Sequence, residues 1–144
     1  MFTKILVPTD GSDLSIKAAR GAVEMARRMN ARLVGMTVVE PYAYTTLSEY
    51  RPEPAGEYER RVEAVARERL APIESDAKSA GVAVETIVAR SFSPFEAIID
   101  TAKRRQCDVI FMASHGRRGL SAVLLGSETQ KVLTHSHIPV MVYR

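Results

Sequence analysis

Apolar residues occur along this chain in short unbroken runs and in longer stretches where they recur every three or four positions. Unbroken runs rich in strand-forming residues predict strands, and the three-to-four spacing predicts helices with one buried face. The expected strands lie at 4–8, where turn formers at 9–12 end the run, and at 33–39, 82–89, 107–113 and 138–143. The expected helices lie between 12 and 30, at 57–80, from 94 to about 105 and from 127 to about 135.

The predicted strands and helices alternate, and this order specifies an α/β fold. Unbroken apolar strands are typical of a parallel sheet that is covered on both faces, and a strand, helix and strand in succession imply a right-handed crossover. We therefore expect a single domain over residues 1–144. Its architecture would be a doubly wound, open five-stranded parallel sheet with strand order 3-2-1-4-5 and helices on both faces.

Polar residues mark several helix ends. Ser12 or Asp13 is expected to cap the first helix, and Asn30 is a reasonable stop for it. Residues 93–96, with the sequence Ser-Pro-Phe-Glu, combine a capping box with a proline at the first helical position. A helix is therefore expected to begin there.

The helix at 57–80 contains a proline, Pro72. A proline ring clashes with the carbonyl four residues back, so a kink or a break is predicted near 69–71. The many charges of this helix are interpreted as a solvated face.

Residues 41–56 follow neither spacing and predict a long loop. Loops of this length in a compact domain are often functional. Tyr42, Tyr44 and Tyr50 could form part of a lid, or they could be ordinary surface residues. The sequence leaves both interpretations open.

A glycine-rich stretch joins the strand at 107–113 to the last helix and includes Gly116, Arg117 and Gly126. Glycines let backbone N–H groups approach a ligand closely, and the start of a helix leaves N–H donors unpaired. Both features favour a phosphate group, and the arginine adds positive charge. In the alternative interpretation this is a glycine turn, in which Ser127 caps its own helix and Gln130 completes a capping box.

Pro8, Thr9 and Asp10 lie at the carboxyl end of the first strand. The predicted strand order places strands one and four side by side, so these residues should lie close to the loop at 116–127. Two segments far apart in sequence would then form one ligand pocket. In the alternative interpretation the Asp10 carboxylate only closes a turn or caps a helix.

Composition removes several function classes. The 20 Lys and Arg residues exceed the 17 Asp and Glu residues by three, and opposite charges are interleaved, so nucleic-acid binding is not expected. Cys107 is the only cysteine, which excludes an internal disulfide, and its expected role is packing. No apolar run reaches about 18 residues, and the N-terminus has no signal-peptide pattern. We therefore expect no membrane association and a cytoplasmic location.

The chain resembles the universal stress protein family, in its nucleotide-binding branch, over essentially its whole length. The resemblance is carried by the segments 4–12, 94–98, 114–116, 124–127 and 139–142. The ATP signature of the family falls on Ala113, Gly116, Gly126 and Ser127, with alanine in place of the first glycine. That methyl group puts close approach of a ligand at this position in question.

The resemblance implies an adenine-nucleotide site. Pro8 and Asp10 would lie against the ribose and adenine, and the backbone at Val38 would meet the adenine edge. The phosphates would be held by Gly116, Gly126 and Ser127. The other residues assigned to this site are Thr9, Ala113, Arg117, Glu128 and Thr129. The implied ligand is ATP, or AMP or ADP, with Mg²⁺ possible on the phosphates.

The resemblance also implies a role in stress adaptation as a sensor or regulator and a homodimer that forms through the last strand, Ile138 to Tyr143. The alternative is a dimeric interaction module that keeps the fold without binding nucleotide, which Ala113 favours. No residue is an obvious general base, so at most slow ATP hydrolysis is expected. His135 and His137 fall on different elements, which makes a metal site improbable, and Ser114 with His115 is not expected to form a nucleophile and base because neighbouring side chains diverge.

Overall fold

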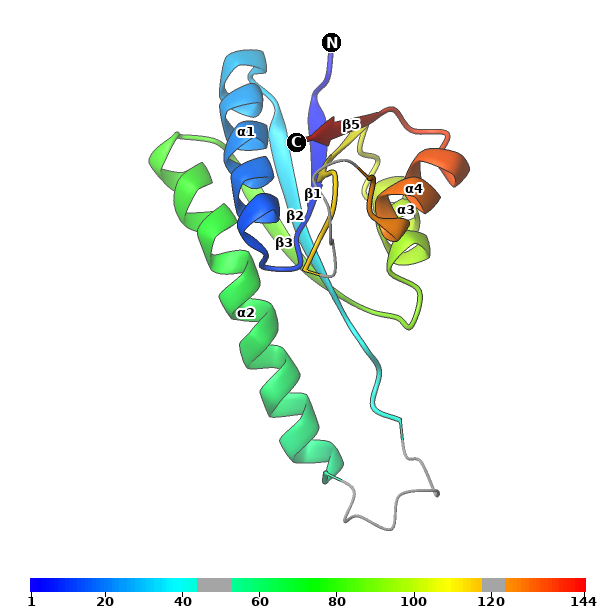
Figure 1. The fold of residues 1–144 in the computed structure, drawn as a ribbon. Helices are drawn as coiled ribbons and strands as arrows, with labels where there is room; N and C mark the ends of the chain where they lie inside the picture. The colour runs from blue at the N-terminus through cyan, green and yellow to red at the C-terminus, as the bar shows by residue number, and fades with distance from the viewer. Residues whose placement is uncertain (44–52, 118–123) are drawn as a thin grey trace.

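The computed structural model describes residues 1–43, 53–117 and 124–144. Strands and helices alternate along the chain as predicted, as Figure 1 shows. They are β1 (Lys4–Pro8), α1 (Asp13–Met29), β2 (Arg32–Val39), α2 (Ala55–Ser79), β3 (Val84–Arg90), α3 (Pro94–Arg104), β4 (Val109–Ala113), α4 (Ser127–His135) and β5 (Val140–Tyr143). The predictions made for Tyr44 and Tyr50 fall outside the described residues.

The five strands form one parallel sheet in the order β3-β2-β1-β4-β5, which confirms the predicted fold class. The central strand β1 pairs with β2 from Lys4 opposite Arg32 to Pro8 opposite Met36. On its other side β1 pairs with β4 through Ile5 and Leu6. The carboxyl ends of β1 and β4 are therefore neighbours, as the sequence predicted.

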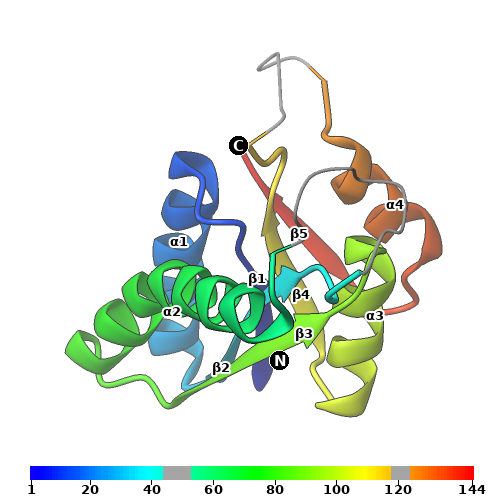
Figure 2. The same cartoon turned by 90° about the horizontal axis from the view of Figure 1, so that it is seen from below.

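Helices cover both faces of the sheet, and successive strand residues alternate between the two faces. Figure 2 shows α1 and α2 on one side of the strands and α3 and α4 on the other. The core residues on the α1 and α2 side include Ile5, Val7, Leu33, Leu70, Ile73, Val109 and Phe111. Those on the α3 and α4 side include Leu6, Val34, Met36, Ile98, Ile110, Met112 and Val132.

Three strands, β3, β4 and β5, begin two residues later than predicted. Val82 donates its N–H to Ala77 O at 2.9 Å, and Cys107 donates its N–H to Ala102 O at 2.8 Å. Both residues therefore close the turn that follows a helix, so β3 and β4 start two residues farther on. Cys107 is buried, as a packing residue should be, and burial raises the pKa of its thiol to about 11.

Helix α2 does not break at Pro72. It runs without interruption from Ala55 to Ser79, so of the kink or break predicted near 69–71 the break is wrong. Leu70 and Ile73, on either side of the proline, are buried in the same core cluster. Their packing holds the helix together although the proline lacks the N–H of one helical hydrogen bond.

The predicted capping box at 93–96 is also wrong, although α3 does begin at Pro94. The Ser93 side chain makes no capping hydrogen bond. The first free donor of this helix, the N–H of Phe95, instead reaches a carboxylate oxygen of Glu128 in α4 at 2.8 Å. Helix α3 is therefore capped by a side chain 33 positions away.

Tyr42 is one of the three tyrosines for which the sequence left a lid and an ordinary surface position open. Its hydroxyl donates to Glu53 O at 2.7 Å, and its ring packs on Tyr58 with 5.3 Å between centroids. Tyr58 in turn packs against the small cluster of Val39 and Val62. Tyr42 therefore ties together the two chain segments that flank the loop.

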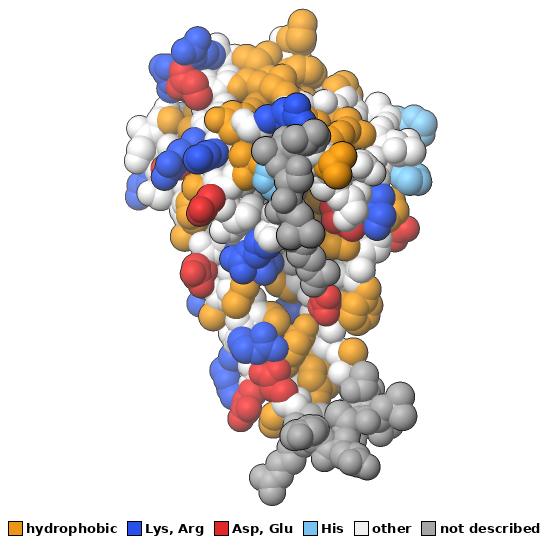
Figure 3. All heavy atoms as spheres, viewed as in Figure 1, with side chains coloured by type: hydrophobic (Ala, Val, Ile, Leu, Met, Phe, Trp, Pro, Cys, Tyr) orange, Lys and Arg blue, Asp and Glu red, His pale blue; other side chains and the backbone are white. Residues whose placement is uncertain are grey.

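Charged side chains are mixed on the surface. On the face shown in Figure 3, Lys and Arg side chains are interspersed with Asp and Glu, and hydrophobic side chains gather in the upper part, where Figure 1 places β5. Within the described residues, no helix combines the length and apolar character that a membrane crossing requires.

Candidate functional site

The segment after β1 and the glycine loop after β4 are bonded to each other. The N–H of Arg117 donates to the Asp10 carboxylate at 2.8 Å. A Cβ added at Gly116 would collide with the same carboxylate, so only glycine allows the loop to approach this closely. Two segments more than 100 residues apart in sequence therefore meet at one edge of the sheet, as predicted.

The Asp10 carboxylate is part of a turn as well as of this junction. It accepts a hydrogen bond from the N–H of Ser12 at 3.0 Å, so the interpretation of Asp10 as a turn residue is also correct. Burial raises the pKa of Asp10, but the hydrogen bonds from Ser12, Arg117 and Ser15 outweigh that effect, and the pKa lies below its ordinary value. Asp10 is therefore ionised at neutral pH.

Thr9 fixes the chain between β1 and α1. Its N–H donates to Met36 O at 2.8 Å, and its buried hydroxyl accepts from the N–H of Gly11 at 3.1 Å and lies 3.0 Å from the hydroxyl of Ser15. Gly11 has a φ of 78°, a left-handed conformation that favours glycine. Pro8 ends the strand opposite Met36. This turn is therefore rigidly held beside the glycine loop.

The far end of the glycine loop is tied back to β4. Gly126 donates its N–H to Ser114 O at 2.8 Å, and the Thr129 hydroxyl donates to Ala113 O at 3.0 Å. A Cβ added at Gly126 would lie 3.0 Å from Cα of His115, so glycine is needed for this approach. Thr129 is buried, and its side chain serves as a tie between α4 and β4.

Helix α4 begins without a side-chain cap. Gly126 is its N-cap residue, in an extended conformation, and none of the described side chains accepts a hydrogen bond there. The alternative interpretation of Ser127 and Gln130 as a capping box is therefore wrong, because Gln130 donates its side-chain amide to Leu125 O at 3.3 Å. Ser127 is exposed at the first helical position. Its hydroxyl and the first N–H groups of the helix are available to an anion.

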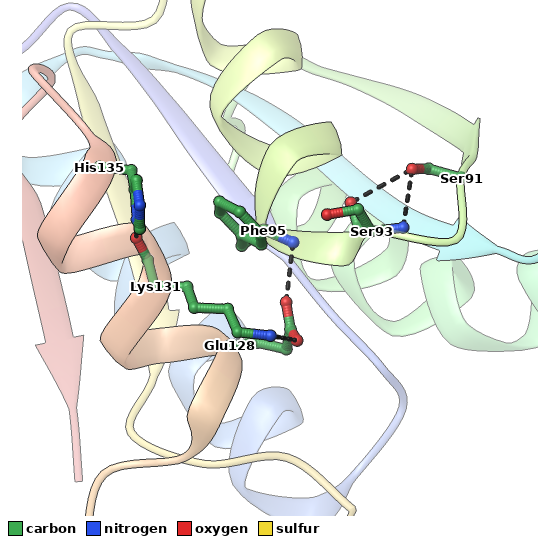
Figure 4. A network of polar contacts seen from close by, with 6 residues as sticks. All are labelled: Ser91, Ser93, Phe95, Glu128, Lys131 and His135. Atoms are coloured by element: carbon green, nitrogen blue, oxygen red, sulfur yellow. Dashed lines mark hydrogen bonds and ion pairs between the residues drawn. The ribbon is translucent and has the colours of Figure 1, made fainter.

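Glu128 directs its carboxylate toward α3, away from its own helix start, as Figure 4 shows. One oxygen accepts from the N–H of Phe95, and the other lies 3.2 Å from Nζ of Lys131. Glu128 was assigned to the ligand site from the sequence. Its side chain is committed to the contact between two helices, so its contribution to an anion site would come from its backbone N–H.

Arg69 of α2 is a site residue that sequence analysis missed. Its Nη1 donates to Val38 O at 3.3 Å and to the Thr37 hydroxyl at 3.4 Å. The charges of α2 were interpreted as a solvated face, but Arg69 follows Ala66 by three positions and Val62 by seven, and both of those residues are buried. Helical spacing alone therefore placed this arginine on the inward-facing side.

Ser114 and His115 lie closer together than predicted. The Ser114 hydroxyl is 3.2 Å from Nδ1 of His115, so the expectation that these neighbouring side chains diverge is wrong. In the described part of the chain, however, no carboxylate hydrogen-bonds to the His115 ring. The pair therefore lacks the acid that orients a catalytic histidine.

Over residues 1–43, 53–117 and 124–144, no group of His, Cys, Asp and Glu side chains is arranged to hold a metal ion. His135 turns its Nδ1 to Lys131 O at 2.8 Å on its own helix. A cavity of about 830 Å³ lies elsewhere, between β3 and α3, lined by residues such as Ala89, Ser91 and Thr101. It shares no residue with the junction of Asp10 and the glycine loop.

Comparison with known proteins gives a consistent picture. The family model described as the universal stress protein family matches residues 1–144. The chain is 35% identical over 149 residues to universal stress protein YxiE of Bacillus subtilis, and the alignment covers all of both proteins. It is 31% identical over 148 residues to universal stress protein MJ0531 of Methanocaldococcus jannaschii, covering all of this chain and 83% of the relative.

Solved structures share the fold. Protein MJ0577 of M. jannaschii superposes with a TM-score of 0.82 at 26% identity, over 99% of this chain and 95% of that one. A universal stress protein in complex with cAMP superposes with a TM-score of 0.71 at 23% identity, over 99% and 97% of the two chains. One from Archaeoglobus fulgidus in complex with dAMP gives 0.70 at 19% identity, over 99% and 98%.

Proposed function

Because this chain belongs to the universal stress protein family, we propose that it binds an adenine nucleotide at the carboxyl ends of β1 and β4. The observation that carries this proposal is the junction of Asp10 with the glycine loop beside an uncapped helix start. Parallel α/β sheets bind ligands where the strand order reverses, and the junction lies at that point. Family neighbours that hold cAMP and dAMP support an adenine nucleotide as the ligand.

In this proposal the phosphates lie against the start of α4. Gly116 and Ser127 supply backbone N–H groups and a hydroxyl, and the N–H groups of Glu128 and Thr129 extend the row of donors. Gly126 contributes by having no side chain, since its own N–H is bonded to Ser114 O. Arg117 adds charge at the loop. The alanine at Ala113 leaves the backbone donor of that position in place.

The base and ribose lie on the β1 and β2 side. Val38 presents a carbonyl that can accept from the adenine amino group, and Pro8, Thr9 and Asp10 border the ribose. The ligand is ATP, ADP or AMP. Any Mg²⁺ is held by the phosphates, because no described side chains form a metal site.

The proposed role is that of a cytoplasmic stress-response sensor or regulator, which acts as a homodimer and hydrolyses ATP slowly at most. Strand β5 is an edge strand, and Met141 exposes 39% of its surface there. An apolar edge of this kind is a pairing site for a second copy. Sedimentation of the wild type and of Met141→Lys tests the dimer, because a lysine on the edge opposes pairing.

The test of nucleotide binding uses the purified protein in two steps. The protein is denatured and the supernatant is assayed for adenine nucleotide, and nucleotide-free protein is then titrated with ATP in a calorimeter. Released nucleotide or saturable binding is expected. If neither is found while the protein is folded, the chain is a dimeric interaction module without nucleotide, the alternative that Ala113 favours.

A further inference from the structure

Two arginine side chains meet above the turn that follows β1. A Cβ added at Gly11 would lie 3.0 Å from Cγ of Arg69 and 3.1 Å from Nη2 of Arg117. One arginine comes from α2 and the other from the glycine loop. Both reach the edge of the sheet where the uncapped start of α4 lies.

Little negative charge lies near the guanidinium groups of Arg69 and Arg117. The carboxylates whose charge acts on Arg69 are Asp10 and Glu68, and the Asp10 oxygens already accept from the N–H groups of Ser12 and Arg117. Burial first, and the charge of Arg117 second, lower the pKa of Arg69, and the two carboxylates only partly offset this effect. Two positive charges in a partly buried place favour an anion between them.

Arg69 is also poorly satisfied in its hydrogen bonds. Its Nε is buried and has no partner among the described residues, and its Nη1 makes only long contacts, of 3.3 and 3.4 Å, with Val38 O and the Thr37 hydroxyl. A buried donor without a partner is costly in a folded protein. The other arginines of α2 with a described partner, Arg61 and Arg67, instead form ion pairs on the surface.

We propose that Arg69 binds the phosphate chain of the ligand together with Arg117, so that α2 completes the anion site. This inference rests on the proposed nucleotide function and adds a residue that the glycine loop does not contain. A phosphate oxygen supplies the acceptor that Nε lacks, and the planar guanidinium suits phosphate in a bidentate contact.

The contact of Arg69 with Val38 O gives the proposal a second consequence. Val38 O is the acceptor assigned to the adenine amino group. Before the nucleotide binds, Arg69 donates to the oxygen that the adenine amino group would use. Binding of ATP exchanges this long contact for a charged one with phosphate. Adenosine, which has no phosphate, gains nothing from Arg69 and must still displace it.

The test compares Arg69→Gln with Arg67→Gln, a matched control two positions away on the exposed side of α2, where Arg67 pairs with Glu63 at 2.6 Å. Affinities for ATP, AMP and adenosine are measured by calorimetry. Loss of a charged hydrogen bond predicts about 10- to 100-fold weaker ATP binding in Arg69→Gln. A smaller loss is expected for AMP and none for adenosine, and the control keeps wild-type affinity for all three.

Equal losses for ATP and adenosine, or an unchanged ATP affinity in folded Arg69→Gln, overturn the proposal. Arg69→Lys is a second variant, for the case that Arg69→Gln does not fold. Lysine keeps the positive charge but lacks the planar guanidinium that can form two parallel hydrogen bonds, so an intermediate ATP affinity is expected.

Binding of sodium triphosphate distinguishes the proposed nucleotide site from the proposed role of the two arginines. If the wild type binds triphosphate but no nucleotide, and Arg69→Gln weakens that binding, the adenine assignment fails while the arginine pair stands. Equal triphosphate binding by wild type and Arg69→Gln overturns the pair.

Discussion

The starts of α3 and α4 carry similar sequences but meet different surroundings. Each begins near a serine that is followed three positions later by Glu or Gln, at Ser93 and Ser127, and neither serine caps its helix. The start of α3 is capped by the Glu128 carboxylate, whereas the start of α4 is capped by no side chain from residues 1–43, 53–117 and 124–144. The positive end of the α3 dipole is therefore already neutralised, and that of α4 is left for a ligand.

Helix α1 is a second example of a helix whose start is already capped. Its Ser12 hydroxyl accepts from the N–H of Ser15 at 3.3 Å, so a side chain at its own N-terminus caps this helix. We call a helix start that a side chain caps closed, and one that no described side chain caps open. A closed start stabilises the fold, and an open one is suited to bind an anion. The difference can be tested at each helix.

The largest effect is expected from a substitution that moves the open start of α4 away from the glycine loop. In Gly126→Val, the new side chain meets the backbone of His115, so the loop and the first turn of α4 must move apart. ATP affinity is expected to fall by at least about 100-fold, measured by calorimetry on folded protein. Gly56→Ala is the control, because only the end of the Arg60 side chain lies near its Cβ, at 4.0 Å. Wild-type affinity in folded Gly126→Val would exclude this loop from the site.

Opening the closed start of α3 should cost stability. Glu128→Ala leaves the N–H of Phe95 without its acceptor, and a loss of about 2 kcal/mol in the free energy of unfolding is expected from urea denaturation. Lys131→Ala keeps the Glu128 acceptor. It removes the surface ion pair with Glu128 and the contact of Nζ with the Phe95 ring, 5.5 Å from the centroid, and should cost at most about 1 kcal/mol. Equal losses in the two variants would contradict a capping role for Glu128.

A smaller loss is expected at α1. Ser12→Ala removes a serine cap and should lower the free energy of unfolding by about 1 kcal/mol. Ser127→Ala, at the open start, should change it by less than about 0.5 kcal/mol because that hydroxyl caps nothing. The pair is compared by thermal and urea unfolding. If both variants lost the same stability, the two helix starts would not differ in this way.

The smallest effect concerns the junction itself and depends on pH. The pKa of Asp10 is lower in the folded chain than its ordinary value of 3.8. The stability that this difference contributes is therefore present above about pH 4 and is lost as the pH falls through the folded-state pKa. Unfolding free energies of wild type and Asp10→Asn should differ at pH 7 and converge once the pH is below the folded-state pKa. A constant difference would mean that ionisation of Asp10 does not support the junction.

Helical periodicity located the elements well but decided little about single polar residues. Together with the unbroken apolar runs it predicted the four helices and five strands that the described residues form, and the expected strand order placed β1 beside β4. It also placed Arg69 on the inner side of α2, yet charge led to its interpretation as solvated. The position of a residue on a helix is local information, but the acceptors that an inward arginine finds belong to β2.

The sequence by itself determined the fold class, the strand order and the meeting of Asp10 with the glycine loop, because hydrophobic spacing and the handedness of crossovers act along the chain. Only the tertiary structure decided which helix starts are closed, that Glu128 caps α3, and that Arg69 joins Arg117 above Gly11. Each of these depends on groups that fold together from distant positions. A capping signature in the sequence indicates that the first N–H groups of a helix need an acceptor, but tertiary packing decides which group accepts from them.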